Sequence, residues 1–118
     1  MRTLTCVSFI FLAAICASAQ CRDVRFGKGH FSTTISGATA KQNTCYRIRA
    51  KTSQLITLHL DATDPKTTFS LSEDYYDADF TADSVRDWQG HTGNVDAYMI
   101  MVGGGKRGTP YKLTVSIK

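Results

Sequence analysis

The chain has 118 residues, a mass of 13.0 kDa, four cysteines and a formal net charge of +4, and 42% of its residues are hydrophobic. This length fits a single domain and excludes a TIM barrel or a two-domain dehydrogenase. The basic residues stand at the two ends of the chain around an acidic middle, with no basic stripe interleaved with aromatic residues, so we expect no nucleic-acid partner.

The N-terminal segment has the features of a secretory signal peptide. A basic start at Arg2 is followed by an apolar run at residues 7–15 and by the small residues Ala-Ser-Ala at 17–19. A membrane anchor is the alternative, but this run is too short to cross about 30 Å of hydrocarbon. We therefore expect residues 1–19 to be removed and residues 20–118 to form one domain. The mature protein would be periplasmic or secreted, with no membrane association.

Removal of the signal peptide would leave two of the four cysteines, Cys21 and Cys45. Two cysteines in an exported chain predict one disulfide, which in the chain-entropy model would stabilise the domain by roughly 3–4 kcal/mol. Two free thiols in a reducing compartment are the alternative, which the signal peptide argues against. His30, His59 and His91 are scattered and offer no ligand spacing for zinc, so we expect no metal and no cofactor.

The mature chain alternates between apolar and polar residues, which is typical of half-buried β-strands. The clearest run covers residues 111–117, where Tyr111, Leu113, Val115 and Ile117 share one face. Further strands are expected at residues 31–36, 45–50, 56–60, 67–71 and 98–102.

The expected strands are short, and glycine, proline and asparagine turn signals separate them. This spacing predicts an all-β fold, a small antiparallel β-sandwich of about seven or eight strands with one disulfide. Only residues 79–88 leave room for one short helical turn.

No arrangement of residues for catalysis stands out, because the chain lacks a Gly-x-Ser-x-Gly motif and both mature cysteines are expected to be paired. Within the acidic stretch, Asp77, Asp79, Thr81 and Asp83 stand at alternate positions, as in the start of a calcium loop. The glycine and the glutamate that such a loop needs are absent. A solvated acidic loop and a recognition loop containing Tyr75, Tyr76 and Phe80 are the other interpretations. Trp88 is either a core residue or part of a binding surface.

Several short motifs follow one another along the mature chain: VRFGKG at residues 24–29, Ser36-Gly37, Tyr46, AKTSQ at 50–54, TTF at 67–69, WQG at 88–90, Tyr98 and the alternating run at 111–117. In this order they resemble the secreted inhibitors of goose-type lysozyme and the broader bacterial pre-peptidase C-terminal β-sandwich. The resemblance covers residues 24–118. It implies a periplasmic or secreted β-sandwich that binds rather than catalyses.

The resemblance also implies a binding loop, because related lysozyme inhibitors insert a loop with a Ser-Gly-x-Tyr motif into the active cleft of the enzyme. Tyr98 matches the tyrosine, whereas Val95 and Asp96 stand where the motif has serine and glycine. The loop at residues 93–98 therefore departs from the pattern and keeps Asn94 and Asp96 as polar side chains. Tyr98 is either a contact residue or a core residue, and its place in an alternating strand favours the core.

The hypothesis from the sequence is an exported protein inhibitor that blocks lysozyme by loop insertion. Its candidate contact residues are Trp88, Asn94, Asp96 and Tyr98, and the acidic stretch at 73–87 would complement a basic enzyme. The alternative is a stand-alone module of the pre-peptidase C-terminal type that binds a cell-wall glycan or a protein partner. Neither hypothesis makes the chain an enzyme.

Overall fold

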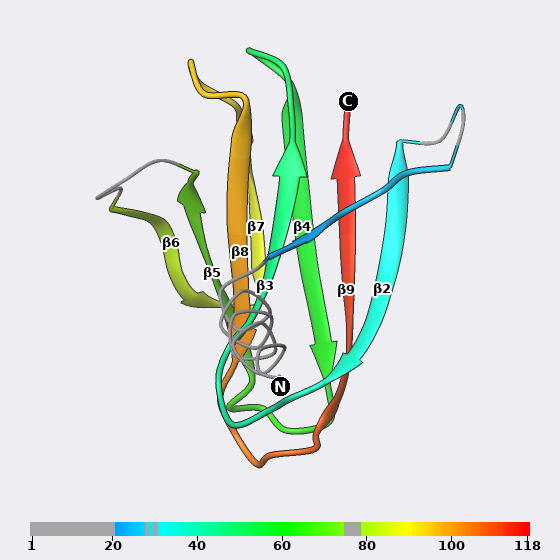
Figure 1. Ribbon diagram of the computed structural model, residues 1–118, viewed down its shortest axis with the longest axis vertical. Helices are drawn as coiled ribbons and strands as arrows, with labels where there is room; N and C mark the ends of the chain where they lie inside the picture. The colour runs from blue at the N-terminus through cyan, green and yellow to red at the C-terminus, as the bar shows by residue number, and fades with distance from the viewer. Residues whose placement is uncertain (1–20, 28, 30, 75–78) are drawn as a thin grey trace, which may run out of the picture.

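The structure, a computed structural model, describes residues 21–27, 29, 31–74 and 79–118 (Figure 1). The signal peptide predicted at residues 1–19 lies outside the described residues. The described part contains nine strands: β1 (Arg22–Asp23), β2 (Ser32–Ala38), β3 (Thr44–Arg49), β4 (Leu55–Ala62), β5 (Thr68–Glu73), β6 (Phe80–Val85), β7 (Asp87–His91), β8 (Ala97–Gly103) and β9 (Pro110–Ile117).

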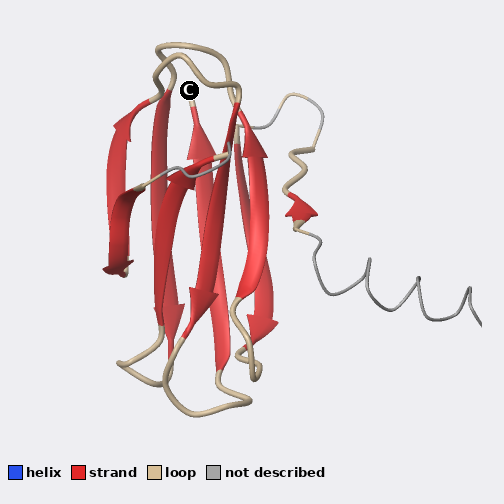
Figure 2. Ribbon diagram, turned by 60° about the vertical axis from the view of Figure 1, so that its left-hand side comes forward, coloured by secondary structure: helices blue, strands red, loops and turns tan. Residues whose placement is uncertain are grey.

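The strands form two sheets that pack against each other as layers (Figure 2). One sheet has the order β1-β3-β8-β5-β6 and the other the order β2-β9-β4-β7. Neighbouring strands are antiparallel, except that β1 runs parallel to β3. The predicted all-β sandwich is confirmed, and β1, β6 and β7 are strands that the sequence pattern did not locate. No helix in the described ranges has the length and apolar character needed to cross a bilayer.

The helical turn considered for residues 79–88 is wrong, because this segment forms β6 and β7. β6 extends the first sheet by pairing with β5, and β7 extends the second sheet by pairing with β4. The chain crosses between the sheets at Arg86, whose backbone oxygen accepts a hydrogen bond from the Leu60 N–H at 2.8 Å. Both segments become strands because the sheet edges offer unpaired backbone donors and acceptors, which no local pattern reveals.

The alternating apolar residues of both sheets meet in one core, as expected for a sandwich. Tyr111, Leu113, Val115 and Ile117 are all buried, which confirms the predicted inward face of β9. The Tyr111 hydroxyl shares a hydrogen bond of 2.7 Å with the hydroxyl of Tyr46, which comes from β3 in the other sheet. Burial and then this hydrogen bond raise the pKa of the Tyr46 hydroxyl, so this group stays protonated. The hydrogen bond between the two tyrosines joins the two layers.

The predicted disulfide between Cys21 and Cys45 is confirmed, with the two Cα atoms 4.6 Å apart. It attaches the residue before β1 to β3, and β1 itself has only two residues to pair with that strand. The two cysteines are 24 positions apart, so the disulfide closes a ring that restricts the unfolded chain. In the chain-entropy model this stabilises the folded state by roughly 3–4 kcal/mol. The disulfide therefore holds the N-terminal segment of the described chain on the sandwich.

The connecting segments gather at the two ends of the sandwich (Figures 1 and 2). At one end, called the loop end below, the turn at residues 50–54 joins β3 to β4 and the loop at residues 92–96 joins β7 to β8. The C-terminus of β9 lies at the same end. The connections at residues 39–43, 63–67 and 104–109 lie at the opposite end.

Candidate functional site

The 92–96 loop and the 50–54 turn are joined by hydrogen bonds around the buried residue Thr92. The Thr92 N–H donates to the backbone oxygen of Gln54, and the Thr92 hydroxyl accepts from the Gln54 N–H, each at 2.8 Å. The same hydroxyl donates to the backbone oxygen of Lys51. Because these bonds cross between the two connections, the loop end is a preorganised surface rather than two independent loops.

Tyr98 supports the 92–96 loop from inside the core. Its side chain is only 4% exposed, and its hydroxyl accepts a hydrogen bond of 2.8 Å from the Gly93 N–H. The structure therefore places this residue where the core interpretation put it. A tyrosine in this position fixes the backbone of the loop without lying on the surface.

Asn94 and Asp96 are the polar side chains that the loop exposes. Val95, between them, is half-buried and packs against the core, so neighbouring residues of the loop face in opposite directions. The backbone oxygen of Asp96 accepts a hydrogen bond from the Ala50 N–H at 3.0 Å. The loop can thus offer one amide and one carboxylate to a partner from a fixed backbone.

The structure does not bring Trp88 to this loop. Trp88 lies opposite Leu58 of β4, half-buried at the edge of the core. A Cβ atom placed on Gly90 would lie 2.6 Å from the indole ring, so the ring covers that glycine. The end of β7 at His91 is three residues further along the strand, or about 10 Å away. A role of Trp88 in binding stays a prediction.

The acidic stretch is only partly described. The carboxylate of Asp74 accepts a hydrogen bond of 2.7 Å from the side chain of Arg47, so the start of the stretch is paired with β3. Residues 75–78, which include both predicted recognition tyrosines and one aspartate of the suggested calcium loop, lie outside the described residues. The calcium and recognition interpretations therefore stay predictions.

The two histidines that the structure describes, His59 and His91, do not form a cluster of metal ligands. His59 pairs with Asp87 on the exposed face of the second sheet, and His91 is exposed at the end of β7. His30 lies outside the described residues. Among the described residues, no group of three or more histidines, cysteines and carboxylates could hold a metal ion.

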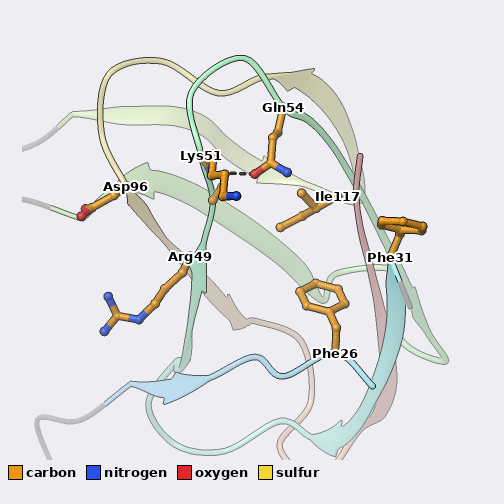
Figure 3. A pocket seen from close by; sticks show the side chains of 8 residues that line it. Phe26, Phe31, Arg49, Lys51, Gln54, Asp96 and Ile117 are labelled. Atoms are coloured by element: carbon orange, nitrogen blue, oxygen red, sulfur yellow. Dashed lines mark hydrogen bonds between the residues drawn. The ribbon is translucent and has the colours of Figure 1, made fainter. Parts of the chain in front are cut away.

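A pocket of about 410 Å³ at the loop end was not predicted from the sequence (Figure 3). Asp96 belongs both to its wall and to the 92–96 loop. Phe31 is the residue that could have indicated it. The sequence pattern assigned Phe31 to a strand at 31–36, whereas β2 begins at Ser32 and Phe31 is 67% exposed. The pocket is lined by Phe26, Phe31, Arg49, Ala50, Lys51, Gln54, Asp96 and Ile117.

Comparisons with known proteins support the fold assignment. No protein-family model and no curated protein matches the sequence. The structure is similar to that of Aeromonas hydrophila PliG, described as a periplasmic lysozyme inhibitor of g-type lysozyme, with 22% identity, a TM-score of 0.73, and coverage of 84% of this chain and 96% of that one. Salmonella Typhimurium PliG, described in the same terms, has 18% identity, a TM-score of 0.60, and coverage of 85% and 99%.

A third similar structure is the pre-peptidase C-terminal domain of a Bacillus anthracis collagenase. It has 13% identity and a TM-score of 0.54, and the match covers 84% of this chain and 95% of that domain. Both classes of protein that the sequence motifs resemble therefore share their fold with this chain. At 13–22% identity, the similarity shows that the strands are arranged in the same way. It does not show that the binding surfaces are alike.

Proposed function

We propose that this chain is an exported inhibitor of lysozyme that acts through its loop end. The observation that carries the proposal is a sandwich shared over nearly the whole length of two periplasmic inhibitors of g-type lysozyme. The fixed 92–96 loop at one end of that sandwich supports it, because an inhibitor needs a surface that fits a cleft without being reordered. The chain binds its partner and catalyses no reaction.

In this proposal, the 92–96 loop enters the active cleft of the enzyme. Asn94 and Asp96 provide an amide and a carboxylate, groups that can replace the hydrogen bonds a cleft makes with a polar substrate. Tyr98 fixes the loop by accepting a hydrogen bond from the Gly93 N–H, and Thr92 fixes it through its hydrogen bonds to the 50–54 turn. The family's serine and glycine are absent here, so Asn94 and Asp96 carry the polar contacts.

Charge contributes to the encounter with a basic enzyme. Glu73, Asp79 and Asp96 belong to the acidic middle of the chain, and Glu73 is the last residue of β5, near the loop end. The side chain of Glu73 lies within 3.8 Å of the Cβ position of Gly93, beside the 92–96 loop. Complementary potentials of this kind mainly accelerate association, and the effect falls as the salt concentration rises.

A second candidate is a stand-alone module that binds a cell-wall glycan or another protein. The likeness to a collagenase pre-peptidase C-terminal domain favours it, as does the replacement of the family's Ser-Gly pair by Val95 and Asp96. In that case the same loop end would bind a wall polymer rather than a lysozyme.

The test is an inhibition assay with purified residues 20–118 against goose-, chicken- and invertebrate-type lysozymes. We expect inhibition of the goose-type enzyme, and we expect Asp96→Asn and Asn94→Ala to weaken it. Asp61→Asn, which alters an exposed acid on β4 away from the loop end, is the matched control and should inhibit as the wild type does. No inhibition of any of the three enzymes at micromolar protein would refute the proposal, and retention on purified peptidoglycan would then favour the second candidate.

A further inference from the structure

The pocket at the loop end has an apolar half, in which Phe31 is exposed to solvent. Phe26, Phe31, Ala50 and Ile117 form it, and Figure 3 shows the two phenyl rings and Ile117 arranged around the opening. Phe31 is 67% exposed, and among the described residues only Phe80, on β6, is a comparably exposed large hydrophobic side chain. Exposed aromatic rings in a concave wall are typical of a surface that receives an apolar group from a partner.

The side chains beside the apolar half are hydrogen-bond donors. The Gln54 side-chain oxygen already accepts a hydrogen bond of 2.6 Å from the Lys51 N–H, so its amide NH₂ group is the part left to meet a ligand. Lys51 also lines the pocket, whereas the charged groups of Arg49 and Asp96 point away from the phenyl rings (Figure 3). A ligand group at this place must accept hydrogen bonds, and a negative charge on it would complement Lys51.

Backbone hydrogen bonds hold the walls of the pocket. The Ile117 N–H donates to the backbone oxygen of Phe31 at 2.9 Å, and Leu55 and Lys118 exchange two hydrogen bonds of 3.0 Å. The 50–54 turn, which carries Lys51 and Gln54, is fixed by Thr92. Binding against Ile117 and the 50–54 turn therefore requires little ordering of these backbone segments.

We propose that this pocket receives a large apolar side chain that stands beside a carboxylate on the partner protein. The apolar side chain would contact Phe26, Phe31 and Ile117, and the carboxylate would meet Lys51 and the Gln54 amide. The pocket shares Asp96 with the 92–96 loop, so a protein docked on that loop covers the pocket as well. We assign the pair to the lysozyme, and the inference therefore rests on the proposed function and extends its contact surface.

The test compares inhibition constants of variants inside and outside the pocket. Phe31→Ala and Lys51→Glu should each weaken inhibition of the goose-type lysozyme by about tenfold or more. Lys41→Glu, which reverses a charge at the opposite end, should stay within about twofold of the wild type. If the wild type inhibits and both pocket variants inhibit as strongly as the wild type, the pocket proposal is overturned. The proposed function would still stand in that case.

A second measurement tests the pocket without any lysozyme. The wild-type domain is titrated with N-acetyl-L-phenylalanine, which combines an apolar side chain with a carboxylate, and with the corresponding amide. Chemical shifts of the Gln54 side-chain NH₂ and the Ile117 N–H should change with the acid and much less with the amide. Equal responses to the two probes, or no response to either, would overturn the proposal even if the wild type proved to inhibit lysozyme.

Discussion

The Tyr98→Phe substitution tests whether the 92–96 loop is held in place from the core. It removes one hydroxyl and with it the hydrogen bond of 2.8 Å from the Gly93 N–H. A hydrogen bond contributes about 0.5–1.5 kcal/mol net. Gly93 is exposed, so water can replace the lost acceptor, and we expect the lower part of that range, about 0.5–1 kcal/mol. The ring itself stays buried, so the core keeps its packing.

The expected consequence is a loosened loop rather than an unfolded protein. If the lost energy is needed to hold the binding conformation, the inhibition constant should rise by about twofold to fivefold. Hydrogen exchange at the Gly93 amide should accelerate, while amides in the middle of β8 and β9 exchange as in the wild type. The two readouts are measured by exchange with NMR detection and by inhibition assay.

Tyr46→Phe is the matched control, because it also removes a buried tyrosine hydroxyl. It breaks the bond of 2.7 Å with Tyr111 between the sheets. The Tyr111 hydroxyl is then left buried without this partner, which should lower the free energy of unfolding by about 1–3 kcal/mol. Inhibition should be unchanged, since this pair does not contact the loop. Unaltered Gly93 exchange in Tyr98→Phe, or equal loss of inhibition in both variants, would refute the reasoning.

Two further predictions concern stability. Replacing both Cys21 and Cys45 by serine should lower the free energy of unfolding by roughly 3–4 kcal/mol in chemical denaturation, and an unchanged denaturation midpoint would contradict that estimate. Hydrogen bonds from the N–H groups of Lys66 and then Lys106 hold the pKa of Asp64 below its ordinary value of 3.8. This carboxylate therefore stabilises the fold above that value and stops doing so as the pH falls through the lower folded pKa. The melting temperature of Asp64→Asn should depend less on pH in that acidic window, and an identical profile would refute the assignment.

The period of two in the sequence predicted which faces of the strands are buried. It succeeded for β9, and for β3 and the residue that follows it, where Tyr46, Ile48 and Ala50 are buried as expected. Alternation is a local property that survives whichever partner a strand finds, so the inward faces can be read before the fold is known. Residues 79–88 failed because their strand character comes from pairing at the sheet edges, which depends on residues far away in the chain.

The candidate site was only partly predictable for the same reason. The loop before Tyr98 could be found because the family resemblance places a Ser-Gly-x-Tyr motif there. The pocket could not, since it joins Phe26 and Phe31 to Ile117, more than eighty positions away, through the pairing of β2 with β9. Trp88 was a candidate contact residue as the only tryptophan of the chain. The register of β7 with β4, which the sequence does not reveal, places it opposite Leu58 and away from the loop.

Hydrogen–deuterium exchange of the wild-type domain, with and without goose-type lysozyme, tests the central claim most directly. The account predicts that the enzyme protects residues 50–54 and 92–96 at the loop end. The connections at 39–43, 63–67 and 104–109 at the opposite end should exchange at the same rate in both samples. Protection confined to the opposite end, or no protection anywhere at saturating enzyme, would contradict the claim that this sandwich binds lysozyme through its loop end.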